Sequence, residues 1–461
     1  MKKMLSLFVS MSLLCISSCK DSPKKLAENV APAEAIVTPE TALKSYLKND
    51  DQTFKWELKE NYSIGDVTVY ELLLTSQKWR EHVWTHELTV LVPKEVSFDG
   101  ALLMITGGSV KEGMPNWSSN EEDKKSISFA QVAEKNKAIV AIVRQVPNQP
   151  LYDGLTEDEL ISFTLHNYKN DKDPTWPLLF PMVKSAVRAM DAVQEFTSKN
   201  LQKEVTRFTV TGASKRGWTT WLTGANDKRV ETIAPMVIDV LNMPVSLDYQ
   251  ITAWNEYSIQ INDYIQLEIP QTVGSEDGKA LTQMVDPYSY RANLIMPKLI
   301  FIGTNDEYWP VDAIKNYIND IPGENYIHYV PNAGHDLGGG EQAVRALSAF
   351  WGKSLNKTPQ TSLAYDLTTD KASATLTVKT TSDELLNAYI WSADSSDRDF
   401  RDEKWTSKQI DSKDHDHIFQ QVKFPKSGFK AFYIDLEYAD PNGGKYTKST
   451  RMYVADDDEI L

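Results

Sequence analysis

A glycine-flanked serine in residues 212–217, Gly-Ala-Ser-Lys-Arg-Gly, constrains the fold of this chain more than any other segment. An apolar run at residues 208–211 precedes it, and a segment typical of a helix follows. Where a strand turns this sharply into a helix, only small residues fit beside the serine, and its hydroxyl stands clear of the sheet. The usual pattern is Gly-x-Ser-x-Gly, but here Arg216 takes the second glycine's position and Gly217 comes one residue later. The segment favours a strand–turn–helix that displays Ser214, although an ordinary turn also fits it when it is taken alone.

The two residue types that such a serine needs follow it in the chain, each after a predicted strand. Residues 297–302 have the pattern of a buried strand, and Gly303 and Asp306 come after it. Residues 326–330 predict another short strand, and the turn-rich segment behind it displays His335. Serine, acid and histidine follow this order in α/β-hydrolases, and open α/β sheets place their sites at the carboxyl ends of strands. The sequence therefore predicts an α/β-hydrolase fold, a mostly parallel central sheet flanked by helices.

Each of the three side chains has a defined role in this chemistry. The hydroxyl of Ser214 is a weak nucleophile unless a neighbouring imidazole takes its proton, and His335 is the predicted base. An acid on the other ring nitrogen fixes the tautomer and stabilises the imidazolium, and Asp306 is predicted for that position. Two alternatives stay open: Asp306 caps a following helix instead, or the acid is Asp239, which follows an apolar run at residues 233–238.

A tetrahedral intermediate also needs hydrogen-bond donors for its oxyanion. The backbone N–H of Lys215, the residue after the predicted nucleophile, is one expected donor. The second is expected from the loop behind the apolar strand at residues 101–106, where Gly107 and Gly108 follow. The side chains of Lys215 and Arg216 have two interpretations. They attract an anionic substrate such as a uronate ester or an acidic glycan, or they form surface ion pairs.

The spacing of apolar residues divides the chain into two predicted domains. Residues 46–356 alternate between strands and helices, among them an amphipathic helix at 178–196, and predict the α/β-hydrolase domain. Residues 240–296 interrupt the alternation with several aromatic side chains, and predict an insertion that covers the strand ends as a lid. From residue 357 to 461, short strands separated by Asp, Ser and Gly predict a β-sandwich of the immunoglobulin or fibronectin type.

The first nineteen residues predict export and a lipid anchor. Two lysines precede an apolar stretch at residues 5–16 that is too short to span a bilayer. The sequence Ile-Ser-Ser-Cys at 16–19 resembles a bacterial lipobox, so Cys19 is the predicted lipidation site; a plain secretory signal cut near Ser18 is the alternative. Residues 20–45 are predicted to form a flexible tether. The expected location is the cell envelope, with the chain anchored to a bacterial membrane and facing the periplasm or the surface.

Composition limits the partners. A net charge of −15 argues against nucleic acid, because phosphate binding demands a basic face. The sequence has no P-loop, no glycine-rich dinucleotide motif and no metal-binding motif of paired cysteines or His-Glu-x-x-His, so no cofactor and no metal are predicted. The expected partner is a small molecule, a glycan-linked ester or a peptide.

Three segments carry a resemblance to a known family. Residues 212–222, 302–309 and 331–335 resemble the PhoPQ-activated pathogenicity-related proteins, and the resemblance extends from about residue 40 to the end. It implies an exported α/β-hydrolase-like protein connected with virulence-regulated responses in some bacteria. It also implies a triad on Ser214, Asp306 and His335, but no substrate.

The leading hypothesis is therefore an exported serine hydrolase that acts by acyl transfer, an esterase or deacylase on a cell-envelope or extracellular substrate. The segment at 303–311 also resembles prolyl-oligopeptidase-like serine peptidases, but those keep Gly-x-Ser-x-Gly and usually carry a propeller domain. A catalytically silent binding or signalling lipoprotein is the second hypothesis, and the substituted glycine at Arg216 supports it.

Overall fold

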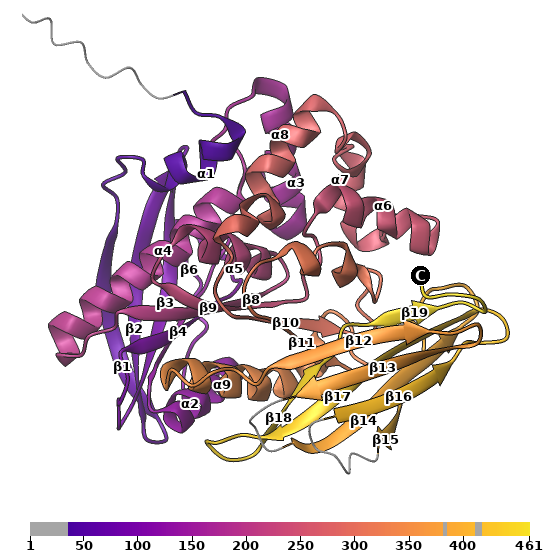
Figure 1. Cartoon of the computed structure of the whole chain (residues 1–461). Helices are drawn as coiled ribbons and strands as arrows, with labels where there is room; N and C mark the ends of the chain where they lie inside the picture. The colour runs from indigo at the N-terminus through magenta and orange to yellow at the C-terminus, as the bar shows by residue number, and fades with distance from the viewer. Residues whose placement is uncertain (1–35, 381–384, 411–416) are drawn as a thin grey trace, which may run out of the picture. The chain divides into compact units, whose positions relative to one another are not determined.

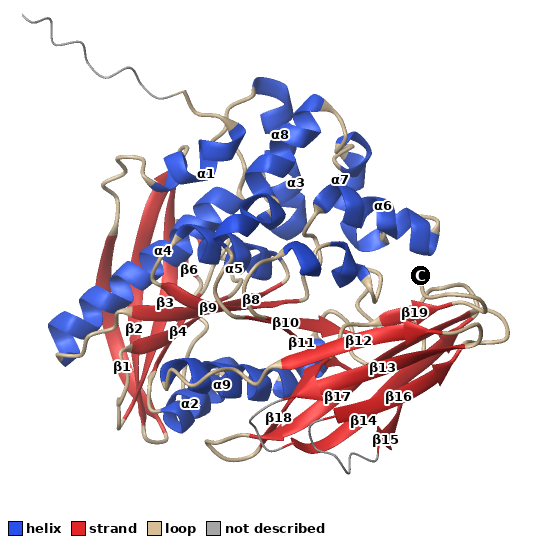
Figure 2. Cartoon of the chain, viewed as in Figure 1, coloured by secondary structure: helices blue, strands red, loops and turns tan. Residues whose placement is uncertain are grey.

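A large mixed β-sheet runs through the computed structural model, which describes residues 36–380, 385–410 and 417–461 (Figures 1 and 2). Its strand order is β1-β2-β3-β7-β4-β8-β9-β10-β11-β18-β17-β14-β15. The sheet begins with antiparallel strands: β1 (Lys55–Ile64), β2 (Val67–Trp79) and β3 (His82–Pro93). Its parallel part comprises β7 (Ile139–Val143), β4 (Gly100–Ile105), β8 (Arg207–Ala213), β9 (Val230–Met236), β10 (Lys298–Gly303) and β11 (Asn325–Val330).

Helices cover both faces of the parallel strands (Figure 2). On one face, α4 (Leu179–Phe196) and α5 (Lys215–Asn226) pack against the sheet; on the other lie α2 (Lys124–Asn136) and α9 (Glu341–Leu355). Neighbouring strand residues serve opposite faces: Leu103 belongs to the apolar core under α4, and Leu102 to the core under α9. Strands buried on both faces are typical of parallel sheets. The predicted α/β-hydrolase fold is thus confirmed, as is the predicted helix at 178–196.

Two helical segments lie outside this regular alternation. Between β9 and β10, where residues 240–296 were predicted to be an insertion, the chain forms α6 (Met243–Trp254), α7 (Asn262–Gln266) and α8 (Glu276–Val285), joined by 3₁₀ turns. Between β7 and α4 lies α3 (Glu157–Asp171). Its first turn carries three acidic residues, which the helix dipole favours at an N-terminus.

The end of the predicted tether differs from the expectation. Residues 39–45 lie in helix α1 (Pro39–Leu47), where Pro39 occupies the first turn and Thr38 precedes it as the cap. Leu43 and Tyr46 are buried, and the Tyr46 ring lies 5.9 Å from the ring of Phe180 on α4. Burial of this apolar face fixes the segment as a helix. The predicted signal peptide, Cys19 and residues 20–35 of the tether lie outside the described residues.

The C-terminal segment consists of two further β-layers with a shared apolar core. One continues the central sheet, because β11 pairs antiparallel with β18 through Ile327 and Ser449. That layer contains β18 (Lys445–Ser449), β17 (Phe429–Ala439), β14 (Leu385–Ser395), β15 (Thr406–Ile410) and β19 (Tyr453–Ala455), and the other contains β12 (Leu363–Thr369), β13 (Ser373–Thr380) and β16 (His417–Lys423).

Residues 37–461 form one compact unit, so the domain boundary at 356/357 stays a prediction. A small hairpin of β5 (Val110–Lys111) and β6 (Met114–Pro115) follows β4. Across the described ranges, no helix has both the length and the apolar character needed to cross a bilayer.

Candidate active site

Ser214 occupies the turn between β8 and α5 in a strained backbone conformation. Its φ of 59° and ψ of −128° lie in a region that non-glycine residues rarely adopt. Two backbone hydrogen bonds hold it there: the Ser214 N–H donates to the Met236 carbonyl at 2.9 Å, and its own carbonyl accepts from the Trp218 N–H at 3.0 Å. This is the sharp strand-to-helix turn that the sequence predicted, and these hydrogen bonds to the surrounding fold hold the strained backbone conformation in place.

The glycine spacing has a direct steric explanation. A Cβ on Gly212 would lie 2.7 Å from the Arg216 carbonyl oxygen, and one on Gly217 would lie 2.8 Å from the Met236 carbonyl oxygen. Both contacts involve backbone atoms, so neither can be relieved by a side-chain movement. Gly217 therefore supplies the close approach of helix to strand, and Arg216 occupies a position where a side chain fits.

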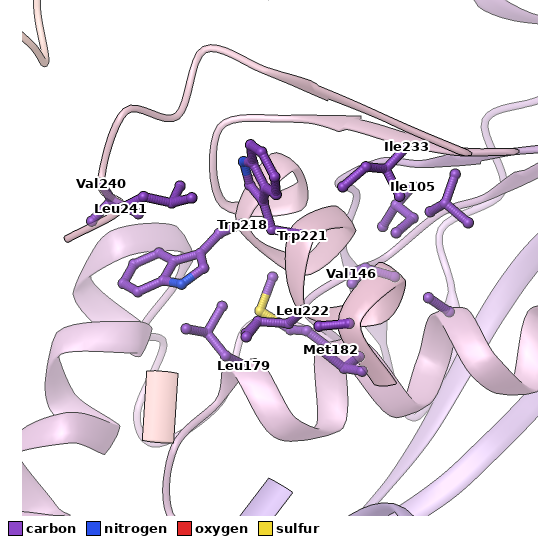
Figure 3. Packing of buried hydrophobic residues seen from close by; sticks show 14 of the residues in the cluster. Ile105, Val146, Leu179, Met182, Trp218, Trp221, Leu222, Ile233, Val240 and Leu241 are labelled. Atoms are coloured by element: carbon purple, nitrogen blue, oxygen red, sulfur yellow. The ribbon is translucent and has the colours of Figure 1, made fainter. Parts of the chain in front are cut away.

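Apolar packing anchors the helix behind the serine. Trp218, Trp221 and Leu222 of α5 are buried and belong to the same core as Leu179 and Met182 of α4 (Figure 3). The indole N–H of Trp218 donates to the Val285 carbonyl at 2.6 Å, which ties α5 to the insertion. The helix thus has a fixed position, and its first N–H groups, which lack intrahelical partners, lie next to Ser214.

The cations beside Ser214 are paired with the acidic start of α3. Lys215 Nζ lies 2.9 Å from both Glu157 Oε2 and Asp158 Oδ2. The Arg216 guanidinium donates to both oxygens of Glu157, at 2.6 and 2.7 Å, and also to the Val146 carbonyl. Burial alone would raise the pKa of Glu157, but the hydrogen bonds and charges of the two cations lower it to about 2. Of the two interpretations of these cations, the structure has the ion pairs, although both side chains are largely buried rather than on the surface.

His335 is hydrogen-bonded to Asp306 through one ring nitrogen. Nδ1 lies 2.9 Å from Oδ2 and 3.1 Å from Oδ1 of the carboxylate. Asp306 is buried, and its Oδ1 also accepts from the Tyr308 N–H at 2.8 Å, in the turn after β10 and not at the start of a helix. The Tyr308 ring stacks on the imidazole with ring centres 4.1 Å apart, and the Glu307 carboxylate accepts from the His335 N–H at 3.0 Å. These contacts fix the orientation of the ring.

The other ring nitrogen faces a different environment. His335 Nε2 is buried and has no hydrogen-bond partner within the described part of the chain. His335, Ser214 and Lys215 line one pocket, together with side chains of the insertion and of α3. The structure therefore brings Ser214, His335 and Asp306 to one edge of the sheet, where Ser214 and His335 line the same pocket.

The rival acid, Asp239, has another partner. Asp239 is only 2% exposed. Its Oδ1 accepts from the Tyr317 hydroxyl at 2.5 Å, and its Oδ2 has no partner among the described residues. Burial, together with the nearby charges of Asp306 and Asp312, raises its pKa to about 7 although the Tyr317 hydrogen bond opposes this. No hydrogen bond connects Asp239 to His335, whose Nδ1 is taken by Asp306.

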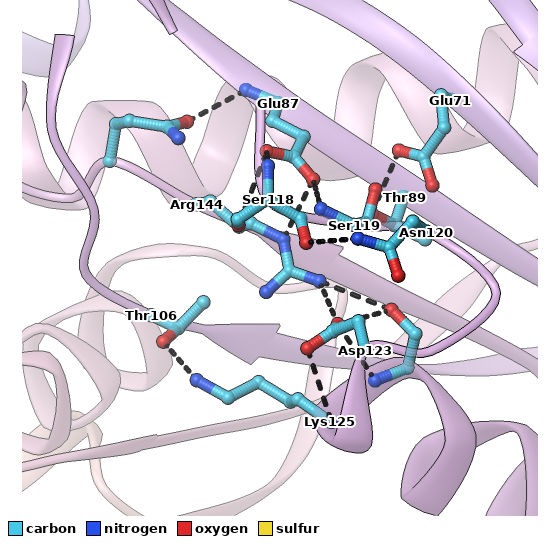
Figure 4. A network of polar contacts seen from close by, with 12 residues as sticks. Glu71, Glu87, Thr89, Thr106, Ser118, Ser119, Asn120, Asp123, Lys125 and Arg144 are labelled. Atoms are coloured by element: carbon cyan, nitrogen blue, oxygen red, sulfur yellow. Dashed lines mark hydrogen bonds and ion pairs between the residues drawn. The ribbon is translucent and has the colours of Figure 1, made fainter. Parts of the chain in front are cut away.

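The predicted oxyanion glycines lie beside the site but do not line the pocket. A Cβ on Gly107 would lie 2.5 Å from the Arg216 guanidinium, and Gly108 has a φ of 144° and packs against Gln145. Their role stays a prediction. The loop that follows them is held by a polar network in which Glu87 accepts from the Ser118 and Ser119 N–H groups, at 2.8 and 2.7 Å (Figure 4).

The same network reaches the start of α2. Arg144 donates to Glu87 at 3.0 Å and to Asp123 at 2.7 Å, and Lys125 Nζ donates to the Thr106 hydroxyl at 2.6 Å. Hydrogen bonds therefore hold the loop at both of its ends. Within the described ranges, no group of three or more His, Cys, Asp or Glu side chains is arranged to hold a metal ion.

Sequence reasoning missed several residues of this site, among them Asp158 and Leu165 of α3 and Ile269 of the insertion. Tyr264 also lines the pocket, and it belongs to the aromatic insertion that was predicted to cover the strand ends. The Tyr264 hydroxyl donates to Asp158 at 2.9 Å, which joins the two segments. The acidic residues at 157–159 after Thr156 do signal a helix start, but nothing local indicates which cations they meet.

The central sheet, whose parallel strands alternate with helices along the chain, and the strained serine turn after β8 define a protein of the α/β-hydrolase fold. The chain belongs to the PhoPQ-activated pathogenicity-related protein family, whose model matches residues 43–401. It is 29% identical over 431 residues to Autocrine proliferation repressor protein A of Dictyostelium discoideum, a match that covers 86% of each chain.

Among solved structures, an acetyl xylan esterase from Paenibacillus sp. R4 is similar, with a TM-score of 0.47 and 14% identity over 67% of this chain and 92% of that one. Acetyl xylan esterase 1 from Thermoanaerobacterium sp. has a TM-score of 0.46 and 17% identity, over 68% and 93%.

Proposed function

We propose that this protein is a serine hydrolase that transfers the acyl group of an ester to water. Ser214 is the nucleophile, His335 the general base and Asp306 the residue that orients the imidazole. The observation that carries this proposal is the state of His335: one ring nitrogen is held by a buried carboxylate, the other is buried and has no partner among the described residues, and the residue lines the same pocket as the strained serine.

The chemistry follows from these positions. As Ser214 Oγ attacks the ester carbonyl, its proton passes to His335 Nε2, and Asp306 stabilises the imidazolium through Nδ1. Collapse of the tetrahedral intermediate breaks the bond to the alcohol, which takes the proton from Nε2. A water molecule then attacks the acyl-enzyme by the same route, giving the acid and restoring the serine. Catalytic hydrogen bonds commonly tighten only when the substrate binds, so the serine–histidine contact is expected to form in the complex.

The oxyanion is expected to bind at the start of α5. The Lys215 N–H, one of the first N–H groups of the helix, is the proposed first donor, and the loop of Gly107 and Gly108 is the proposed source of the second. Removal of one such donor from an enzyme of this type costs about 3–4 kcal/mol of transition-state stabilisation.

A fluorophosphonate probe tests the proposal. It is expected to label the folded protein at Ser214, as located by mass spectrometry of the modified peptide, and the Ser214→Ala variant is expected to remain unlabelled. Ser246→Ala is a matched control, because Ser246 is buried in the insertion, its hydroxyl donates to the Leu241 carbonyl, and neither residue lines the pocket. A folded wild-type protein that takes no label and turns over neither p-nitrophenyl esters nor aminoacyl anilides would refute the proposal.

An esterase is favoured over a peptidase of the prolyl-oligopeptidase type. In the described ranges, the strands outside the central sheet and its extension form a three-stranded layer and a small hairpin, and no propeller. Turnover of aminoacyl anilides with no turnover of esters would reverse this preference.

A second candidate function is a catalytically silent signalling protein, which the name of the Dictyostelium relative, an autocrine proliferation repressor, favours. Complementation separates the two. If the Ser214→Ala variant restores the phenotype of a deletion strain, the signalling role is supported; loss of complementation by a folded variant supports catalysis.

We also propose export and lipid anchoring at Cys19. The support is the lipobox-like sequence at residues 16–19 behind the apolar stretch. Metabolic labelling with a fatty acid is expected to mark the wild-type chain and not the Cys19→Ser variant, and equal labelling of both would exclude this site.

A further inference from the structure

We infer that the pocket beside Ser214 receives an uncharged aliphatic acyl group longer than acetyl, so that the substrates are neutral esters of apolar acids. This inference rests on the proposed hydrolase function and assigns its substrate class. Two features carry it: the apolar wall of the pocket and the mutual neutralisation of the charges that line it.

The wall of the pocket is built by apolar side chains from several elements. Trp218 comes from the helix behind the serine, Leu165 from α3, and the insertion supplies others, including Met243, Leu247 and Ile261. The last three are at most 6% exposed, so the insertion presents them inward and not to solvent. Binding of an alkyl chain to such a surface is favourable because it removes apolar area from water. The surface offers few hydrogen-bond partners to a polar substrate.

The charged members of the lining are already satisfied by one another. Lys215 Nζ contacts both Glu157 and Asp158, and Asp158 also accepts from the Tyr264 hydroxyl. An anionic acyl group that recruited Lys215 would leave Asp158 without its cation in a largely buried position. Such an uncompensated charge is costly, so the arrangement selects against a carboxylate.

A further acidic residue reinforces this selection. Asp263, at the start of α7, has a raised pKa because of its burial and because of the nearby charges of Asp158 and Glu159, although Lys215 opposes the effect. Three carboxyl groups therefore lie near Lys215: those of Glu157 and Asp158, which pair with it, and that of Asp263. A uronate ester or an acidic glycan, which Lys215 and Arg216 suggested from the sequence, meets unfavourable charge here.

The first experiment measures kcat/KM for a series of p-nitrophenyl esters. Burial of one methylene corresponds to about a fourfold gain, so the hexanoate is expected to exceed the acetate by about 10²-fold if all four added methylenes enter the pocket. The p-nitrophenyl monoester of adipic acid, which ends in a carboxylate, is expected to react at least about tenfold more slowly than the hexanoate. Equal rates across the neutral series, or preference for the adipate ester, would overturn the inference.

A pair of variants on α6 locates the effect. Leu247 lines the pocket and is 5% exposed, whereas Ile251, one turn further along the same helix, is 39% exposed and outside the lining. Leu247→Trp is expected to lower kcat/KM for the hexanoate by at least tenfold and to change that for the acetate by less than threefold. Ile251→Trp is expected to change neither. Loss of acetate and hexanoate turnover in equal proportion in a folded Leu247→Trp protein would contradict a role in acyl selection.

A second substitution covers the case in which tryptophan prevents folding. Leu247→Ala widens the pocket, so the acyl length of maximal kcat/KM is expected to move to a longer chain, and an unchanged optimum would count against the inference. The two levels of proposal fail differently. If Ser214 is labelled and the acetate is hydrolysed without any preference for acyl length, only this inference is refuted. If the protein takes no label and turns over no ester, the hydrolase function is refuted as well.

Discussion

The buried carboxyl of Asp239 makes the unfolding free energy depend on pH in a direction opposite to that of most acidic residues. Its pKa is raised from the ordinary 3.8 to about 7. Because one pKa unit corresponds to about 1.4 kcal/mol, ionisation of the buried group costs about 4 kcal/mol. Below pH 4 the carboxyl is protonated in the folded and unfolded states alike. As the pH rises to 7, only the folded state keeps the proton, so stability falls, and above pH 7 the full cost is present.

The Asp239→Asn variant tests this reasoning. An asparagine keeps an oxygen to accept from Tyr317 and never ionises, but it brings an NH₂ group to the unpartnered side, at a cost of about 1 kcal/mol. At pH 8.5 the variant is therefore expected to be more stable than the wild type by about 3 kcal/mol, and near pH 4.5 the advantage disappears. Asp312→Asn is the matched control, because Asp312 is equally buried but pairs with Lys315 at 2.8 Å and accepts from Tyr249. It is expected to destabilise the protein.

Calorimetric melting temperatures between pH 4.5 and 9 measure both variants. The difference between Asp239→Asn and the wild type is expected to change sign or vanish as the pH falls through the interval between 7 and 4. A difference that is the same at every pH would mean that Asp239 ionises without cost in the folded protein. That result would refute the assignment of a desolvated carboxyl at Asp239.

Two further substitutions address the histidine. Asp306→Asn is expected to lower kcat by about 10⁴-fold with little change in melting temperature, because the amide no longer fixes the reactive tautomer of His335. Asp336→Asn, which alters only the neighbouring turn, is the control in the ester assay. Equal activity of the two variants would exclude the proposed role of Asp306. Gly303→Ala places a Cβ against the backbone carbonyls of Ala333 and Gly334, so it is expected to displace the histidine loop and lower kcat/KM by at least about 10²-fold. Unchanged turnover by this variant would contradict the tight packing of β10 against that loop.

The fold and the three proposed catalytic residues could be predicted because their signals are local. Ser214, Asp306 and His335 each follow an apolar strand, and parallel strands bring their carboxyl ends to one edge whatever the loops do between them. The helix α1 could not be predicted in the same way. Its short apolar face, formed by Leu43 and Tyr46, packs in a core with α4, which lies far along the chain. The pattern of a short segment does not indicate such a distant contact.

The polar surroundings of the serine were beyond sequence reasoning for a related reason. Glu157 and Arg216 are 59 residues apart in the chain. The sequence does not show which anion a cation meets, so Lys215 and Arg216 were compatible with an anionic substrate as well as with ion pairs. Two observations on the structure decide between them: the short distances to Glu157 and the burial of Lys215.

The substituted glycine, which favoured a silent protein from the sequence, has a different meaning in three dimensions. The sharp turn needs one close approach of helix to strand, and Gly217 provides it against the Met236 carbonyl. Arg216 is then free to hold Glu157, and with Glu157 the N-terminus of α3, beside the nucleophile. That contact places Asp158 where it neutralises Lys215. The departure from the usual motif is therefore compatible with catalysis, and the ion pairs that it allows neutralise the charges beside the apolar wall from which we infer a neutral, apolar acyl group.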